Sequence, residues 1–207
     1  MSEPDFEQAR RYALQRLERE LHPALCYHSL AHTRDEVVPA AERLAAMEGV
    51  SEDELLLLRT AAYFHDLGFV ERRQGHEEVG IRIASQVLPG FGYSPAQVTA
   101  IGELILATRL PQSPIKPLDA ILADSDLDML GRADFIELNR LLRRELAAFD
   151  PPVSDATWYR QQLIFVRDHR YWTPTARKLR DPGKQRNLEL LEALLANAER
   201  AAATAEP

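Results

Sequence analysis

Apolar residues recur at helical spacing along almost the whole of this 207-residue chain, and no segment shows the alternating pattern of a half-buried strand. In residues 5–20, for example, the apolar side chains fall every three or four positions and so share one face of a helix. Because helices bury such faces against one another, the sequence predicts an all-α fold, a helical bundle.

Short polar signatures interrupt this pattern and predict where helices begin and end. Ser51 with Glu54 has the spacing of a capping box, and Ser94 followed by Pro95 marks a second helix start. Gly68 stands where the helix that follows Ser51 is expected to stop.

The second half of the chain is expected to continue in the same way. Residues 118–131 read as one helix that ends at a glycine, and residues 171–184, with two prolines and a glycine, read as a turn-rich connection to a last helix at 185–203. No repeat or linker is visible. We therefore expect a single domain over residues 1–207, with a motif-bearing core at about 20–150 and a helical extension at 151–207.

Composition excludes several classes of function. The net charge of −7 disfavours a sequence-independent grip on nucleic acid, and the single cysteine, Cys26, excludes an internal disulfide and a cysteine-based zinc site. No run approaches the roughly 18 apolar residues of a membrane span, so no membrane partner is expected. The N-terminal segment is acidic and polar, unlike a signal peptide, and we expect a cytoplasmic protein.

Two histidines in the segment YHSLAHT stand four residues apart. On a helix His28 and His32 would share a face, about 6 Å apart at Cβ. A helical pair of this spacing is also found in zinc metalloproteases, where the residue after the first histidine is a glutamate that acts as general base. That position is Ser29 here, so the protease interpretation is dropped.

A histidine directly before an aspartate, His65-Asp66, lies inside the apolar run AAYFHDLGF. A charged pair in such surroundings is unfavourable unless something compensates it. Neighbouring residues on a regular helix point roughly 100° apart, so both can bind one ion only at a groove or at the end of the helix. From these residues alone, a divalent cation and an internal ion pair or helix cap remain equally good explanations.

Three aspartates alternate in the apolar segment ILADSDLDML. Asp124 and Asp128 would share one face of a helix, whereas Asp126 would point elsewhere. Asp126 and Asp128 are explained well enough as solvent-facing or capping residues. Asp124 follows directly on apolar residues and is harder to explain without a partner.

Together these residues resemble the HD superfamily of metal-dependent phosphohydrolases, whose pattern is a histidine, a His-Asp pair and a later aspartate on separate helices. Here the pattern reads His32, His65-Asp66 and Asp124, within about residues 20–150. The resemblance implies that these four residues bind a divalent ion (Mn, Mg, Fe, Co, Ni or Zn). Such an ion lowers the pKa of water and polarises a phosphoryl group, with Asp66 in a catalytic role as well.

The segment around His28 also resembles the tyrosine-histidine-asparagine segment of cyclic-nucleotide phosphodiesterases, which implies that His28 is the general acid. Ser29 stands where those phosphodiesterases have an asparagine, and two further positions depart from relatives within the superfamily. Phe69 stands where bacterial 5′-nucleotidases have a glutamate, and Thr108 stands near where a binuclear enzyme would have a histidine. His76 can supply a histidine of that second site. We therefore expect one tight ion and a second, weaker one through His76.

A phosphate substrate needs cationic neighbours. Arg73, Arg109 and Lys116 lie in or beside the loops after the His-Asp pair and after residue 108, so with His76 they are the candidates for binding it. The expected function is hydrolysis of a phosphate mono- or diester, with a small molecule, a nucleotide, as substrate. The alternatives are a non-catalytic nucleotide-binding regulatory module with a structural metal site, and a di-iron oxygenase, which Thr108 disfavours.

Overall fold

The structure is a computed structural model that describes residues 3–205, and every regular element in that range is a helix. The predicted all-α class is therefore confirmed. The chain divides into two compact units, an N-terminal unit at Met1–Leu127 and a C-terminal unit at Asp128–Pro207. The single-domain organisation expected over residues 1–207 stays a prediction, and its residues 1–2 and 206–207 lie outside the described residues. No helix among the described residues is long and apolar enough to cross a membrane.

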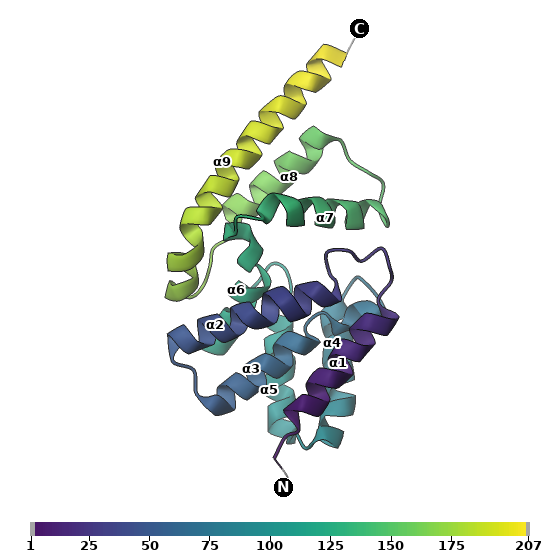
Figure 1. Ribbon diagram of the computed structural model, residues 1–207, viewed down its shortest axis with the longest axis vertical. Coiled ribbons are helices and arrows are strands. Elements are labelled where there is room, and N and C mark those ends of the chain that lie inside the picture. The colour runs from purple at the N-terminus through teal and green to yellow at the C-terminus, as the bar shows by residue number, and fades with distance from the viewer. Residues whose placement is uncertain (1–2, 206–207) are drawn as a thin grey trace. The chain divides into compact units, whose positions relative to one another are not determined.

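The N-terminal unit is built from α-helices that pack against one another around a core of apolar side chains. Helix α3 packs against α1, α2 and α5, and α2 packs against α6 (Figure 1). Short π-helical or 3₁₀ segments connect several of them. In chain order the elements are α1 (Phe6–Glu20), η1 (His32–Val37), α2 (Val38–Glu48), α3 (Glu52–Phe64), η2 (Leu67–Val70), α4 (His76–Val87), η3 (Leu88–Phe91), α5 (Pro95–Ala107) and α6 (Pro117–Asp126).

Helix starts in this unit follow the capping signatures of the sequence. The Ser51 hydroxyl accepts a hydrogen bond from the backbone N–H of Glu54, and the Glu54 carboxylate accepts one from the backbone of Ser51. Ser94 caps α5, with Pro95 as its first residue. Both predicted caps are confirmed, because a cap depends on residues that are neighbours along the chain.

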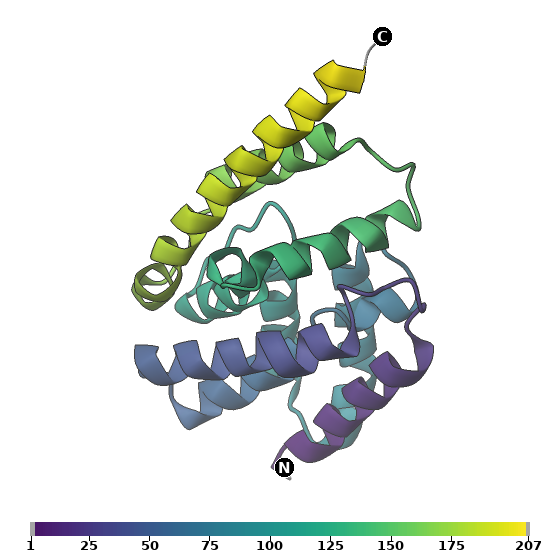
Figure 2. The ribbon, with the colours of Figure 1, turned by 45° about the horizontal axis from the view of Figure 1, so that its top comes forward.

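The C-terminal unit contains η4 (Asp128–Gly131), α7 (Phe135–Ala147), α8 (Asp155–Asp168) and α9 (Pro174–Ala205). Helices α8 and α9 lie side by side, as both ribbon views show in green and yellow (Figures 1 and 2). The segment expected to be one helix over 118–131 is instead α6 followed by the short 3₁₀ turn η4, with Leu127 between them.

Helix α9 corrects a second prediction, because it begins at Pro174 and runs through Pro182 where a turn-rich connection was expected. Tertiary packing explains the difference. A Cβ atom on Gly183 would lie 1.9 Å from the carbonyl oxygen of Gly131 in η4, so the two backbones touch at this point. Glycine permits this close approach, and the contact holds in helical form a segment whose local propensity favours a turn.

Candidate metal centre

His65 and Asp66 stand at the point where α3 ends. The last residue of the helix is Phe64, and the backbone of Asp66 has left helical geometry, with φ −98° and ψ 3°. This change of direction brings the two neighbouring side chains together, with 3.3 Å between His65 Nε2 and Asp66 Oδ2. The end of the helix thus removes the roughly 100° divergence that a regular helix would impose.

Gly68 allows the start of α4 to approach this helix end. A Cβ atom at position 68 would lie 1.9 Å from the carbonyl oxygen of His76, so any larger residue would push α4 away. His76 is the first residue of α4, and its Nε2 atom lies 3.4 Å from Asp66 Oδ1. The two oxygens of Asp66 therefore face different histidines.

His32 reaches the same carboxylate from the start of η1, a π-helical turn that precedes α2. Pro39, near the start of α2, has no N–H for a regular helical bond, and the wider turn lies directly before it. The Nε2 atom of His32 lies 3.8 Å from Asp66 Oδ2. His28 lies in a bend before η1 rather than on a helix with His32, which corrects the expected shared face.

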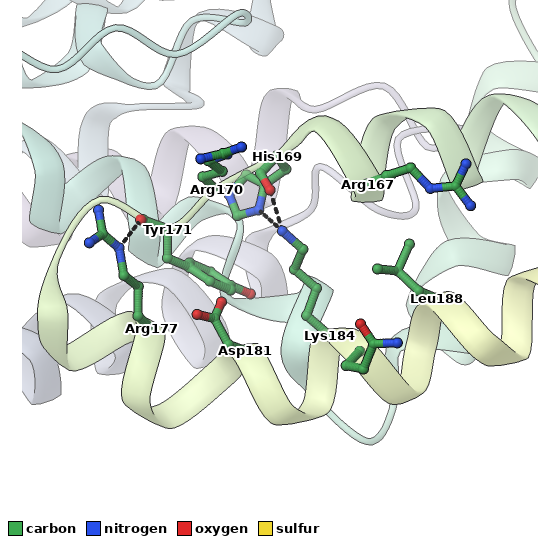
Figure 3. A pocket seen from close by; sticks show the side chains of 9 residues that line it. Arg167, His169, Arg170, Tyr171, Arg177, Asp181, Lys184 and Leu188 are labelled. Carbon is green, nitrogen blue, oxygen red and sulfur yellow. Dashed lines mark hydrogen bonds between the residues drawn. The ribbon is translucent and has the colours of Figure 1, made fainter.

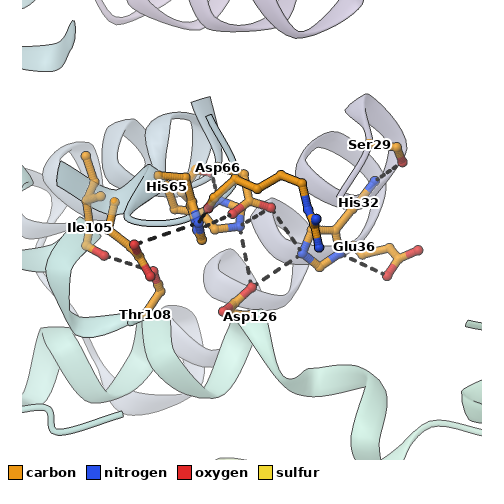
Figure 4. Close-up of polar contacts among 12 residues, drawn as sticks. Ser29, His32, Glu36, His65, Asp66, Ile105, Thr108 and Asp126 are labelled. Atoms are coloured by element: carbon orange, nitrogen blue, oxygen red, sulfur yellow. Dashed lines mark hydrogen bonds and ion pairs between the residues drawn. The ribbon is translucent and has the colours of Figure 1, made fainter. Parts of the chain in front are cut away.

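The fourth group of the cluster is Asp126, the last residue of α6. Its Oδ1 atom lies 3.4 Å from Nε2 of His32 and 3.4 Å from Nε2 of His65 (Figure 4). Its side chain is 18% exposed and faces the histidines, so the interpretation of Asp126 as a solvent-facing or capping residue is wrong. The Asp124 side chain is completely buried. Its expected role as the fourth ligand stays a prediction, beside which Asp126 now stands as the better-placed candidate.

Two of the three histidines, His65 and His76, are held from the far side by a hydrogen bond, so that Nε2 is presented to the carboxylates. The Nδ1 atom of His65 lies 2.8 Å from the carbonyl oxygen of Ala62, and that of His76 lies 3.1 Å from the carbonyl oxygen of Arg73. A carbonyl can only accept, so Nδ1 carries the proton in both rings and the neutral form has its lone pair on Nε2. Nδ1 of His32 lies 3.5 Å from Oε2 of Glu36, which favours the same tautomer.

Burial and charge act against each other at this cluster. Burial alone would lower the pKa of His32, but the contacts with Asp126 and Glu36 and the charge of Asp66 outweigh it and raise that pKa to about 9. Burial alone would raise the pKa of Asp126, but His32 and His65 lower it to about 2. The charge of His65 likewise outweighs burial and holds the pKa of Asp66 well below its usual range.

The donor set fits a divalent cation. His32, His65 and Asp66 are buried and each offers one ligand atom within 4.8 Å of the others. Within the described residues, His65 Nε2 and Asp66 Oδ2 are buried without any hydrogen-bond partner, although they face each other. Two imidazole nitrogens with carboxylate oxygens suit a borderline or hard divalent ion, which would satisfy both atoms.

An aromatic stack borders the cluster. The ring of Phe69, from η2, packs against two imidazoles, with its centroid 4.5 Å from that of His28 and 3.9 Å from that of His76. The ring centroids of His28 and His32 are 6.1 Å apart. The stack therefore holds His28 beside the metal cluster, a role for Phe69 that the sequence alone did not suggest.

The other substrate-binding candidates differ in their surroundings. Arg73 contributes its backbone carbonyl to His76. Arg109 forms an exposed ion pair with Glu78 at 2.6 Å, and Lys116 forms an exposed ion pair with Glu103. Exposed pairs of this kind are weak, so these cations can exchange partners, and their part in substrate binding stays a prediction. The Thr108 hydroxyl donates to the carbonyl of Ile105.

Comparisons with known proteins agree with this geometry. Residues 28–128 match the family model of the HD domain. A crystal structure described as a predicted HD superfamily hydrolase, from an uncultured Thermotogales bacterium, is 23% identical, with a TM-score of 0.61 over 94% of this chain and 93% of that one. A crystal structure of a Lactobacillus plantarum protein is 18% identical, with a TM-score of 0.64 over 91% and 95%. These two likenesses show the shared fold.

No curated protein matches the chain. The matched range contains His32, the His65-Asp66 pair and both aspartates at the end of α6, and its family binds divalent metal ions. The resemblance inferred from the four-part motif is therefore confirmed, and residues 28–128 of this chain belong to the HD domain family of metal-dependent hydrolases.

Proposed function

We propose that this protein is a metal-dependent phosphohydrolase that cleaves a phosphate mono- or diester, and that its substrate is a nucleotide. The observation that carries the proposal is the arrangement around Asp66, whose Oδ2 faces His32 and His65 while its Oδ1 faces His76. Buried nitrogen and oxygen atoms without hydrogen-bond partners destabilise the folded protein. A bound cation would satisfy them, so their convergence supports a cation site.

The proposed ligands of the tight ion are His32, His65, Asp66 and an aspartate of α6. We take this aspartate to be Asp126, because its carboxylate lies 3.4 Å from both histidines, and we keep Asp124 as the competing assignment. When bound, a divalent ion would stabilise charge on the phosphoryl oxygens and make water a stronger nucleophile at neutral pH. The proposed ion is one of Mn, Mg, Fe, Co, Ni and Zn, and analysis of the metal in the untreated protein identifies it.

His76 is proposed to serve a second, weaker ion. Its Nε2 faces Asp66 Oδ1, so Asp66 can bridge two positions while His65 and His32 remain on the Oδ2 side. Thr108 stands near where a second histidine ligand is expected, and its hydroxyl donates to the backbone carbonyl of Ile105. The second metal position therefore has fewer side-chain ligands than the first. Fewer protein ligands predict a lower affinity.

His28 is proposed to donate a proton to the leaving oxygen of the substrate. It stands outside the ligand cluster yet next to it, and Phe69 holds the plane of its ring by stacking at an interplanar angle of 21°. A histidine that is fixed in orientation but not committed to the metal suits a general acid near neutral pH. Arg73, Arg109 and Lys116 are proposed to bind the phosphate groups.

Metal analysis of the untreated protein, followed by a panel of nucleoside mono- and diesters with several divalent ions, tests this function. We expect co-purified metal and turnover of at least one nucleotide that is lost on chelation and restored by one ion. Tight nucleotide binding without turnover for any ion would instead support the alternative, a regulatory module with a structural metal site.

A further inference from the structure

The C-terminal unit has a cavity of its own, lined mainly by residues from the end of α8, the segment that follows it and the first half of α9. Its volume is about 490 Å³, within the usual range for small-molecule sites. Figure 3 shows the side chains that surround it. Four of the lining residues are cationic and one is a carboxylate: Arg167, Arg170, Arg177, Lys184 and Asp181.

Lys184 is the most unusual of these residues, because its side chain is buried with only 9% exposure. Its ammonium donates to the backbone carbonyl of His169 and lies 3.5 Å from Nδ1 of the same residue. Within the described part of the chain, no carboxylate forms an ion pair with Lys184. A buried cation without an ion-pair partner is unfavourable, and the resulting field attracts an anion.

The neighbours of Lys184 increase the positive field. Among residues 3–205, Arg170 and Arg177 also have no carboxylate partner, and Arg177 is held instead by the backbone carbonyl of Tyr171 at 2.7 Å. Burial lowers the pKa of Lys184, and Arg170 lowers it further, although Asp181 acts in the opposite direction. Arg167, by contrast, has a surface partner in Glu192.

His169 adds a neutral donor to this site. Because an ammonium can only donate, Nδ1 of His169 accepts from Lys184 and the ring proton resides on Nε2. Within the described residues this Nε2 atom is buried and has no hydrogen-bond partner. Burial, followed by the charge of Lys184, lowers the pKa of His169 to about 4, so the ring is neutral at physiological pH.

We propose that this cavity is a binding site for a diphosphate, free or as an ester, that carries at least two negative charges, separate from the metal centre. The excess of cations over carboxylates in the lining sets the charge of the ligand, and a 490 Å³ cavity exceeds the size of a single phosphate ion. Guanidinium groups match the geometry of phosphate oxygens, and the buried ammonium acts as a point charge. This inference does not depend on the hydrolytic activity proposed above.

Calorimetric titration of the 207-residue protein with inorganic pyrophosphate, in buffer with a chelator, tests the proposal. We expect saturable binding of one pyrophosphate per chain. Arg170→Ala should weaken it about 10- to 100-fold, as expected for the loss of a hydrogen bond to a charged group. Arg170 is exposed, so its replacement should leave the fold intact.

Two matched variants make the result specific. Arg186→Ala removes an exposed arginine of α9 that does not line the cavity and should leave binding unchanged. Asp66→Ala disables the metal centre and should also leave pyrophosphate binding at the cavity unchanged. Absence of saturable binding, an unchanged affinity in Arg170→Ala, an equal loss in Arg186→Ala, or loss in Asp66→Ala would each overturn the proposal. Tighter binding of citrate than of pyrophosphate would overturn the assignment to phosphates.

Discussion

The Oδ1 atom of Asp126 lies 3.4 Å from Nε2 of His65, although the two residues come from helices far apart in the sequence. Asp126 stands at the last position of α6 and His65 directly after α3. The contact brings a second carboxylate to an imidazole that already meets Asp66. It therefore favours Asp126 over Asp124 as the aspartate that completes the cluster.

Asp126→Asn is expected to weaken binding of the tight ion by more than the roughly 10- to 100-fold that the loss of an outer partner of a ligand costs, because it removes a charged ligand and keeps the volume of the side chain. Asp124→Asn is the matched control, two residues away on the same helix, and should retain the metal. Metal content after dialysis, measured by mass spectrometry, compares the two. Loss of metal in Asp124→Asn with retention in Asp126→Asn would restore the assignment made from the sequence.

Asp66→Ala is expected to abolish metal binding, because it removes the carboxylate that faces all three histidines. The metal-containing wild type should unfold at higher temperature than the variant, since an ion bound to the native state stabilises it by mass action. Thermal unfolding with and without added ion measures both effects. Full metal occupancy in the variant would contradict the proposed site.

The choice between Asp124 and Asp126 depends on tertiary packing, whereas other features of the fold depend on neighbouring residues alone. Helix caps such as Ser51 with Glu54 depend on adjacent residues, so the pattern of the chain predicted them. Which side of α6 faces His65 depends on how α6 packs against α3, and the apolar segment around the aspartates gives no preferred face. The local sequence does not predict a helix through Pro182 for a similar reason, because that helix depends on the contact of Gly183 with Gly131.

Acid and metal should compete for His32. Its pKa is raised to about 9 in the metal-free protein, above the 6.5 of an unperturbed histidine, so the folded state holds a proton there at neutral pH. An ion must displace that proton, and its affinity should therefore rise as the pH increases from about 6.5 to about 9. Calorimetry in buffers of different ionisation enthalpy should show proton release on binding; binding without proton release at pH 7 would contradict the assignment.

The same shift predicts the opposite trend for the stability of the metal-free protein. The folded-state pKa of His32 exceeds its unfolded value, so protonated His32 contributes to the free energy of unfolding. This contribution is fully present below pH 6.5 and is lost as the pH rises through about 9. The loss should be on the order of 1–3 kcal/mol. Denaturant unfolding of chelator-treated protein at pH 6.5 and 9 measures it, with His32→Gln as the control that should remove this part of the pH dependence.

His76→Ala is expected to separate the two proposed ion positions. The tight ion should remain, since the Oδ2 side of Asp66 keeps His32 and His65, whereas the weaker ion should lose its histidine ligand. Metal-free protein, prepared with a chelator, is titrated with Mn²⁺ and followed by electron paramagnetic resonance. The titration gives the number of tightly bound and of weakly bound ions. Loss of the tight ion in this variant would mean that His76 belongs to the first position.

His28→Ala is expected to keep the metal and to lower turnover by about 10²- to 10⁴-fold, the usual contribution of general acid catalysis. His28 borders the cluster through its stack on Phe69, so its removal leaves the proposed ligands in place. The loss should be much smaller for a nitrophenyl ester, whose leaving group is stable as an anion and needs no proton. Rates for both substrate types, measured beside metal content, test this.

A metal ligand would behave differently from an acid in the same comparison. His32→Ala should strip the ion and depress all substrates alike, which makes it the matched control for His28→Ala. Equal losses for good and poor leaving groups in His28→Ala, with metal retained, would turn His28 into a positioning residue. In that case Phe69→Leu, which removes the aromatic ring stacked on His28 and on His76, should reproduce the same pattern. Loss of metal in His28→Ala would instead make His28 a ligand.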